Sequence, residues 1–234
     1  MKRKQTRRPI QQRDAEATRA KILRAALVEF GQRGLPDTRT DDIAARCKVN
    51  KRMIYYYFGS KQGLYLAALE KVYEDLVRRE REIDVEHLDP AAAIEQMINL
   101  KIDHYIDHPP FISFLTMENL YKGRNLRKSK KLDAFKTPLT QMIARILERG
   151  VRAGLFRRDV DPFDLYVSIC GLGFVYFANR HTLGAIFARD LMSAEMVERR
   201  RRAIVAMVLG YLQGDGPPLR RSAGKAQMLE PLAL

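Results

Sequence analysis

Cysteine is scarce in this chain, with two among 234 residues. Two cysteines are too few for the disulfide framework of a small secreted domain, and both lie in apolar helical patterns, as reduced thiols do. The first 13 residues contain no apolar core, which argues against a secretory signal. The longest uncharged run, residues 165–179, is too short to span a bilayer comfortably. These absences predict a cytoplasmic protein without a membrane partner.

Enzyme signatures are also missing. We find no glycine-rich nucleotide-binding pattern, and no G-x-S-x-G, C-x-x-C or H-E-x-x-H motif. No segment shows convincing strand alternation either, whereas helical periodicity recurs along the chain. The sequence therefore predicts an all-α protein that is not an enzyme and needs no cofactor or metal.

Positive charge is abundant and unevenly distributed. The net charge is +14, and residues 1–61 hold 16 Lys and Arg against 6 Asp and Glu, while the remainder holds 26 against 22. A basic N-terminal quarter on a nearly balanced body indicates a polyanionic partner for that quarter. Nucleic acid fits better than a membrane, because the basic segment has no long amphipathic face.

Residues 38–61 have the pattern of a short helix, a tight turn, a second short helix and the start of a third. Thr38 or Thr40 is expected to cap the first helix, Asn50 the second, and Ser60 the third. In the second helix Ile54 and Phe58 are four residues apart and are expected to face inward. The opposite face, which is cationic and aromatic, is then exposed. A helix-turn-helix places such side chains against base edges in the major groove.

We predict DNA contacts from this segment. Arg52 is the candidate for a bidentate guanine contact, and Lys61 can meet a backbone phosphate near free helical N–H groups. The alternative is an ordinary helical corner with a solvated basic face. The predicted DNA-contacting residues are Arg39, Thr40, Lys51, Arg52, Met53, Tyr55, Tyr56 and Lys61.

The same residues carry a family resemblance. The matching elements are Thr38 and Thr40, Ile43-Ala44, Val49-Asn50, Tyr55 to Phe58, and Ser60-Lys61-Gln62-Gly63-Leu64. With them, residues 18–69 resemble the N-terminal domain of the TetR family of bacterial transcriptional regulators (TetR/AcrR type). Lys48 stands where the family usually has the turn glycine, so it is expected to adopt positive φ at a cost on the order of 1 kcal/mol. Arg52 and Met53 stand where small residues are common, which suggests a different base preference.

The helical pattern and the resemblance together give a domain plan. We predict a basic mobile arm (1–13), a DNA-binding domain (14–62, helix-turn-helix about 39–58), a C-terminal ligand-binding and dimerisation domain (63–213) and a flexible tail (214–234). The resemblance implies an Ω-shaped homodimer, and nine predicted helices agree with it. They span about 14–33, 38–47, 50–58, 60–81, 90–108, 111–121, 125–153, 162–188 and 193–212.

Two of these helices have the composition of an interface. Residues 165–177 are apolar nearly all round, and Gly171 and Gly173 allow close approach of another helix. Paired with the apolar face of residues 204–211, they are expected to build a four-helix bundle across a two-fold axis. The alternative is that both helices fill the core of the monomer.

A ligand pocket is expected among the middle helices, although aromatic residues and methionine at helical spacing also build ordinary cores. Glu118 is informative, because a buried carboxylate needs a partner such as Arg, Tyr or a ligand. His104 and His108 are four residues apart and can share a metal, or form a solvated pair. The predicted pocket residues are His104, Tyr105, His108, Phe114, Met117, Glu118, Tyr121, Tyr166 and Cys170.

The leading hypothesis is a homodimeric, ligand-responsive repressor that binds a near-palindromic operator in double-stranded DNA and responds to an unknown small molecule. The resemblance implies that the ligand tilts the helix joining the two domains. Two alternatives stay open. One is an all-α metal-dependent enzyme using His104, His108 and Glu118, and the other is a sequence-indifferent architectural DNA-binding protein that relies on the basic arm.

Overall fold

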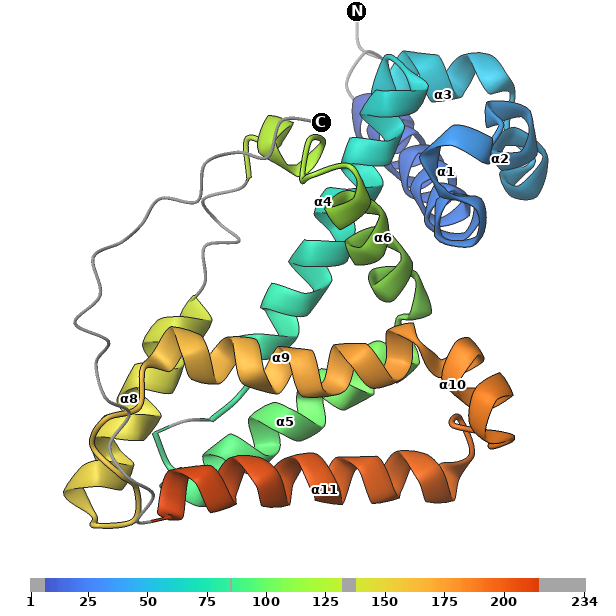
Figure 1. The fold of residues 1–234 in the computed structure, drawn as a ribbon. Coiled ribbons are helices and arrows are strands. Elements are labelled where there is room, and N and C mark those ends of the chain that lie inside the picture. Colours follow the sequence, from blue (N-terminus) through green and yellow to red (C-terminus); the bar gives the residue numbers. More distant parts are fainter. Residues whose placement is uncertain (1–6, 85, 132–137, 215–234) are drawn as a thin grey trace, which may run out of the picture.

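The structure, a computed structural model, describes residues 7–84, 86–131 and 138–214 (Figure 1). This part of the chain is all-α, as predicted, with ten α-helices, one short 3₁₀ helix and no strand. The elements are α1 (Arg7–Asp37), α2 (Thr40–Cys47), α3 (Lys51–Phe58), α4 (Lys61–Glu80), α5 (Pro90–Asp107), α6 (Pro109–Leu120), η1 (Leu126–Lys128), α8 (Pro138–Arg152), α9 (Pro162–Ala178), α10 (Arg180–Phe187) and α11 (Ala194–Gln213).

Helices α1–α3 form a small head around the start of α4. Ile22, Ile43 and Ile54, one from each helix of the head, are fully buried. Gly34 breaks the helical path near the end of α1 with φ 71° and ψ 179°, and α2 follows within a few residues. The predicted end of this helix near residue 33 therefore coincides with the break at Gly34, although a helical turn continues to Asp37.

Helix α4 joins the head to the larger body formed by α5, α6 and α8–α11. Figure 1 shows α4 running from α3 down to the level of α5 and α9. Its buried stripe includes Leu64, Ala68, Val72 and Leu76, spaced at four residues on one face. One helix therefore contributes buried residues to both the head and the body.

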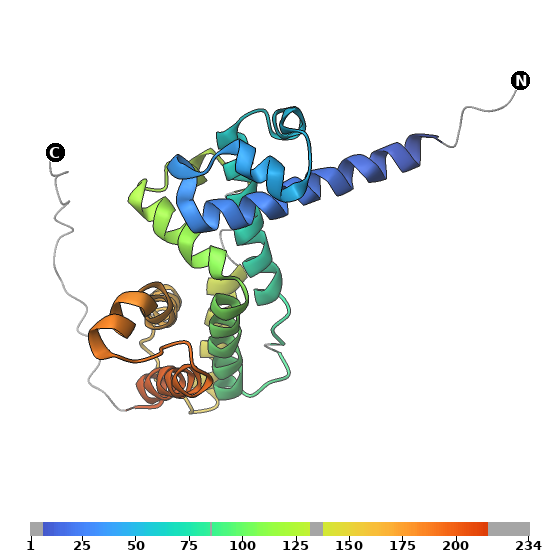
Figure 2. The ribbon, with the colours of Figure 1, turned by 90° about the vertical axis from the view of Figure 1, so that its right-hand side faces the viewer.

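A stack of aromatic rings fastens the head to the body. The Tyr65 ring packs edge-on against Phe30 of α1 and stacks on Phe114 of α6, with ring centroids 5.2 and 5.3 Å away. Figure 2 shows α6 lying against α1 beside α4. The end of α1 therefore rests on the body as well as on the head.

The helix pattern departs from the sequence prediction in two places. The stretch 162–188 is divided at Asn179, whose side-chain amide donates to the Val175 carbonyl, so α9 and α10 are separate helices. The stretch 125–153 is not one helix either, because Ser129 ends η1 in an extended conformation and α8 starts at Pro138. The predicted count of nine is corrected to ten α-helices in the described ranges.

Part of the predicted mobile arm is helical. Helix α1 begins at Arg7, so residues 7–13 are helical; Pro9 is tolerated because N–H groups in a first turn have no helical partner. Residues 1–6 lie outside the described residues. Gly214 ends α11 in an extended conformation, and the rest of the predicted tail lies outside the described residues. Within the described ranges no helix has both the length and the apolarity needed to cross a bilayer.

Candidate DNA-binding surface and effector cavity

A left-handed residue makes the tight turn between α2 and α3. Lys48 has φ 52° and ψ 43°, the strained conformation expected for a residue in the place of a glycine. Its N–H donates to the Ala45 carbonyl at 3.2 Å, and the Val49 N–H reaches Ala44 at 3.1 Å. These bonds satisfy the free carbonyls at the end of α2 and set the angle of the second helix.

The caps of α3 and α4 are those predicted. The Asn50 side chain accepts from the Arg52 N–H at 2.9 Å, and the Ser60 hydroxyl accepts from the Gly63 N–H at 3.0 Å. These bonds fix where both helices start, and so direct the first turn of α3 outward.

The predicted cap of α2 is wrong. Arg39 occupies the cap position and makes no side-chain cap bond. The buried Thr38 hydroxyl instead donates to the Gly34 carbonyl at 2.6 Å, where it closes the end of α1. Thr40 lies inside the first turn of α2, and its hydroxyl is 3.3 Å from the Tyr55 hydroxyl. Both threonines therefore hold the head together.

Four of the predicted DNA-contacting residues are exposed around α3. Tyr56 is 77% exposed and Tyr55 is 44% exposed, although Tyr55 is tethered to α2 through Thr40. Arg39 and Arg52 are exposed and make no ion pair or side-chain hydrogen bond within the described residues. Two unpaired guanidinium groups and two phenol rings are thus exposed on or next to the α2–α3 helix pair, which we call the reading pair.

The other predicted contacts are partly occupied within the chain. Lys51 binds the Asp41 carboxylate at 2.8 Å, and this bond raises the pKa of Lys51 and lowers that of Asp41. The Lys61 ammonium donates to the Pro36 carbonyl at 3.0 Å. Met53 is half-buried and packs against the head core. Lys51 and Lys61 would have to exchange these partners to reach a phosphate.

The body contains a cavity of about 490 Å³ between α4, α5, α6 and α9. Most of its wall is apolar, and five aromatic rings stand in it: Tyr73, Tyr105, Phe111, Tyr166 and Phe174. The tyrosines of the wall are neutral at physiological pH, since burial raises the pKa of each of them. Burial also raises the pKa of the Cys170 thiol. A cavity of this size suits a small organic ligand.

One ion pair lies in this cavity wall. The Lys101 ammonium of α5 donates to the Glu80 carboxylate of α4 at 2.5 Å, and both residues are buried. Burial alone would lower the pKa of Lys101, but the adjacent Glu80 carboxylate favours the ammonium and the pKa lies above its ordinary value. The ammonium also lies 5.1 Å from the centroid of the Tyr166 ring.

Comparison with known proteins assigns two parts of the chain to one family. Residues 22–68 match the family described as bacterial regulatory proteins, tetR family, and residues 90–208 match the tetracyclin repressor-like C-terminal domain. The chain belongs to the TetR family. Members of this family are DNA-binding transcriptional regulators, typically dimeric, whose C-terminal domain binds small molecules.

Relatives of known name agree with this assignment. The chain is 37% identical over 182 residues to the HTH-type transcriptional repressor NicS of Pseudomonas putida, covering 78% of this chain and 86% of NicS. It is 36% identical over 108 residues to the HTH-type transcriptional regulator RutR of Escherichia coli, covering 46% and 50%. The solved structure of the ketosteroid transcriptional regulator KstR2 of Mycobacterium tuberculosis shares the fold, with TM-score 0.63, 20% identity and coverage of 84% and 95%.

The cavity of about 490 Å³ is lined by three of the nine pocket residues predicted from the sequence, namely Tyr105, Tyr166 and Cys170. Sequence reasoning missed Glu80 and Lys101. Lys101 was signalled by its position in a buried stripe of α5 whose neighbours Ile98 and Ile102 are apolar. Glu80 had no comparable signal, because it lies in a strongly charged run.

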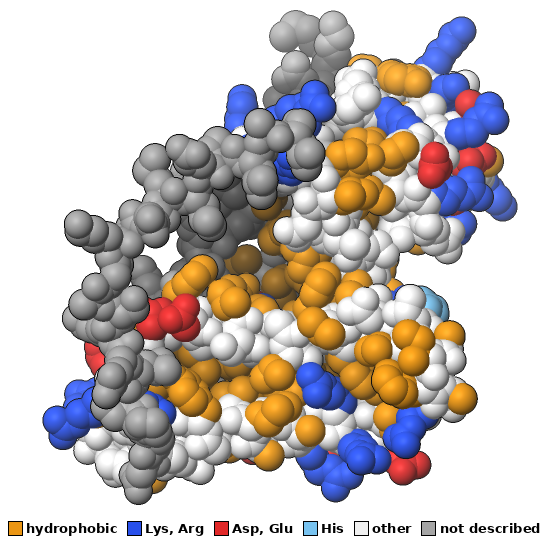
Figure 3. All heavy atoms as spheres, viewed as in Figure 1, with side chains coloured by type: hydrophobic (Ala, Val, Ile, Leu, Met, Phe, Trp, Pro, Cys, Tyr) orange, Lys and Arg blue, Asp and Glu red, His pale blue; other side chains and the backbone are white. Residues whose placement is uncertain are grey.

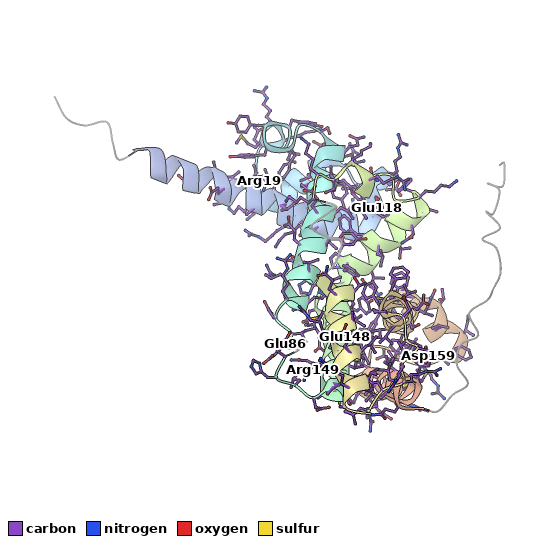
Figure 4. All side chains as sticks on the ribbon, turned by 90° about the vertical axis from the view of Figure 1, so that its left-hand side faces the viewer. Arg19, Glu86, Glu118, Glu148, Arg149 and Asp159 are labelled. Carbon is purple, nitrogen blue, oxygen red and sulfur yellow. The ribbon has the colours of Figure 1, made fainter. Side chains whose placement is uncertain are left out.

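Glu118 lies outside the cavity, near the head. Figure 4 shows it on α6 beside α4 and α1. Its buried carboxylate accepts from Asn125 at 2.8 Å, from the Leu126 N–H at 2.9 Å and from the Tyr65 hydroxyl at 3.4 Å. The partner that burial requires is therefore supplied by the chain itself, and Glu118 anchors the loop after α6.

His104 and His108 stack on each other beside a separate small cavity of about 180 Å³, with ring centroids 4.6 Å apart. Burial lowers the pKa of His104 to about 3, with His108 adding to the effect, and burial also lowers that of His108. In the described part of the chain no three His, Cys, Asp or Glu side chains are grouped to hold a metal ion. Since Glu118 is bound elsewhere, the metal-enzyme alternative lacks its third ligand.

The remaining predicted pocket residues also lie away from the main cavity. Phe114 is buried in the aromatic stack with Tyr65. Met117 lines a groove between α1 and the body, and its methyl group lies where a side chain at Gly34 would be. Tyr121 ends α6 and is half-buried. Phe114 and Met117 thus lie where the body meets α4 and the end of α1.

Proposed function

We propose that this TetR-family regulator is a homodimeric repressor that binds a near-palindromic operator and releases it when a small molecule enters the cavity. The observation that carries the proposal concerns one helix, α4. It follows directly after the reading pair, α2 and α3, and its second half lines the effector cavity. NicS, which matches over most of its own length, is named a transcriptional repressor.

In this proposal α3 reads the operator. Arg52 lies in the first turn of α3, is exposed and has no partner within the described residues, so it can present two donors to a guanine edge. Arg39 and Lys48 are exposed at the two ends of α2 and supply phosphate contacts. Tyr56 adds an exposed ring and hydroxyl. The domain boundaries proposed for this arrangement are residues 14–62 and 63–213.

The dimer forms through α9 and α11. Large apolar side chains stand exposed on both helices: Phe163, Val167 and Val175 on α9, and Met207 and Tyr211 on α11. Figure 3 shows hydrophobic side chains over this face of the body. Exposed apolar residues gathered on two adjacent helices are typical of a protein interface, and pairing two copies buries them in a four-helix bundle.

Ligand binding is transmitted through α4. Tyr73, Leu76, Val77 and Glu80, all from the second half of α4, line the cavity, while the first half packs against α1 and α3. A ligand that favours one position of α4 changes the spacing of the two reading heads in the dimer. Recognition helices must be one helical turn of DNA apart, about 34–36 Å, or a multiple, so a shift of a few ångströms loses contacts.

Selection of bound duplexes from random DNA at physiological salt, followed by sequencing, tests the proposal. We expect a near-palindromic site, and we expect Arg52→Ala to relax one position in each half-site at a cost of about 1–3 kcal/mol. Arg158→Ala is the matched control, because it removes the same charge from an exposed position remote from α3. A library without enrichment, or equal effects of the two variants, would contradict the proposal.

A further inference from the structure

The charges of the cavity wall cancel each other. Among the residues that line it, Glu80 and Lys101 are the ionised pair, and the phenols and the thiol are neutral for the reasons given above. The pair uses one ammonium hydrogen and one carboxylate oxygen, and neither group makes another hydrogen bond within the described part of the chain. A donor and an acceptor therefore lie side by side in an apolar wall.

We propose that the cavity takes an uncharged, planar aromatic molecule with a hydrogen-bond donor next to an acceptor on one edge, as in a lactam. This inference rests on the proposed function in taking the cavity as the effector site. The donor of the ligand meets the Glu80 carboxylate and its acceptor meets the Lys101 ammonium, so the ion pair stays intact.

Charged molecules are disfavoured by the same pair. A ligand carboxylate would compete with Glu80 for Lys101 and would leave Glu80 buried without its partner. A ligand ammonium would displace Lys101 from Glu80 with the equivalent result. An uncharged ligand with a donor next to an acceptor can hydrogen-bond to both charged groups without separating them. Hydrogen bonds to charged groups are stronger than those between neutral groups.

The rings of the wall favour a flat ligand. Tyr105 stacks with Phe111, with ring centroids 5.9 Å apart, and Tyr73 meets Phe111 edge-on at 6.1 Å. Tyr105 and Phe111, together with Tyr166 and Phe174, contribute aromatic surface to the cavity wall. The volume of about 490 Å³ accommodates a molecule of two fused rings.

Titration calorimetry on the full-length protein tests this class with four probes of similar size. They are carbostyril, which has the lactam edge, its N-methyl derivative, which lacks the donor, naphthoate, an anion, and naphthylmethylammonium, a cation. We expect carbostyril to bind at least about tenfold more tightly than each of the others, the ratio expected for one hydrogen bond to a charged group. Tighter binding of a charged probe, equal binding of the N-methyl derivative, or binding of none overturns the proposal.

Variants connect the preference to the ion pair. The double variant Glu80→Leu with Lys101→Met removes both charges together, so no charge is left buried alone, and circular dichroism verifies that it folds. We expect it to bind carbostyril and N-methylcarbostyril equally. The matched control is Glu74→Leu with Lys131→Met, which removes a pair joined at 2.6 Å outside the cavity and should keep the preference. If the control loses the preference as well, or the first variant keeps it, the assignment to Glu80 and Lys101 is wrong.

The DNA selection described above separates this inference from the proposed function. If a duplex is enriched while carbostyril fails to bind, the proposed ligand class is wrong and the proposed function as a DNA-binding regulator is still supported. If no duplex is enriched, the proposed function fails even when carbostyril binds the cavity. Release of the selected duplex by carbostyril, and not by N-methylcarbostyril, supports both.

Discussion

Replacing His104 with phenylalanine is expected to make the fold less sensitive to acid. His104 is 1% exposed, and both of its ring nitrogens lack a hydrogen-bond partner within the described residues. Its ring meets Phe111 edge-on at 4.9 Å and stacks on His108, contacts that a phenyl ring can keep. The substitution therefore removes the titrating group while it preserves most of the packing.

The magnitude follows from the two pKa values of His104. The pKa is about 3 in the folded protein and 6.5 in an unfolded chain, because burial and the neighbouring His108 disfavour the imidazolium. Lys101 and Arg79 add to this effect, and Asp75 opposes it. As the pH falls through 6.5, His104 binds a proton in the unfolded chain but stays neutral in the folded protein. The free energy of unfolding therefore decreases between pH 6.5 and about 3. Between pH 7 and pH 5 this amounts to about 2 kcal/mol.

Urea unfolding followed by circular dichroism at pH 7 and pH 5, at fixed protein concentration and salt, measures the effect. The difference in unfolding free energy between the His104→Phe variant and the native protein should shift by about 2 kcal/mol toward the variant at the lower pH. His181→Phe, at an exposed position, serves as the control and should show no such shift. A difference that stays constant to within about 0.5 kcal/mol would refute the reasoning.

Four further substitutions test other features. Lys48→Gly relieves a positive φ and should stabilise the head by up to about 1 kcal/mol in thermal unfolding, which an unchanged or lower midpoint would contradict. Gly173→Ala places a methyl group 2.8 Å from the Tyr105 ring, so we expect a loss of about 1–3 kcal/mol in urea unfolding. Val175→Glu puts a charge on the exposed face of α9 and should yield monomers in sedimentation velocity. Glu118→Ala leaves the buried Tyr65 hydroxyl and two part-buried N–H donors without their acceptor and should cost at least about 1–3 kcal/mol in urea unfolding, which a smaller loss would contradict.

The reading pair could be predicted closely because its signals are local. Asn50 and Ser60 cap helices through bonds within three residues, and Gly34 breaks a helix through its own backbone. The cap of α2 was mispredicted because the Thr38 hydroxyl is taken by carbonyls of the preceding helix. When a short polar side chain can reach more than one hydrogen-bond partner, the three-dimensional packing around it decides which hydrogen bond it makes.

The cavity was harder to predict for a related reason. Aromatic residues, methionine and histidine recur at helical spacing along α5 and α6, and that spacing does not tell which cavity each one faces. Phe114 and Glu118 contact Tyr65 near the head, while Tyr105 packs against Phe177 of α9. The ion pair joins residues 21 positions apart on two helices, so it depends on how α4 and α5 pack.

The internal ion pairs of the head bear on how strongly salt weakens DNA binding. Besides Lys51, which binds Asp41, two arginines of the head are held by carboxylates within 2.7 Å, Arg33 by Asp42 and Arg46 by Glu29. Each phosphate neutralised on DNA releases condensed counterions and adds roughly 0.9 to the slope of log affinity against log salt. Cations already neutralised inside the protein release none. The slope should therefore be markedly shallower than the 16 Lys and Arg of residues 1–61 would suggest, leaving more of the DNA affinity of this regulator intact as ionic strength rises.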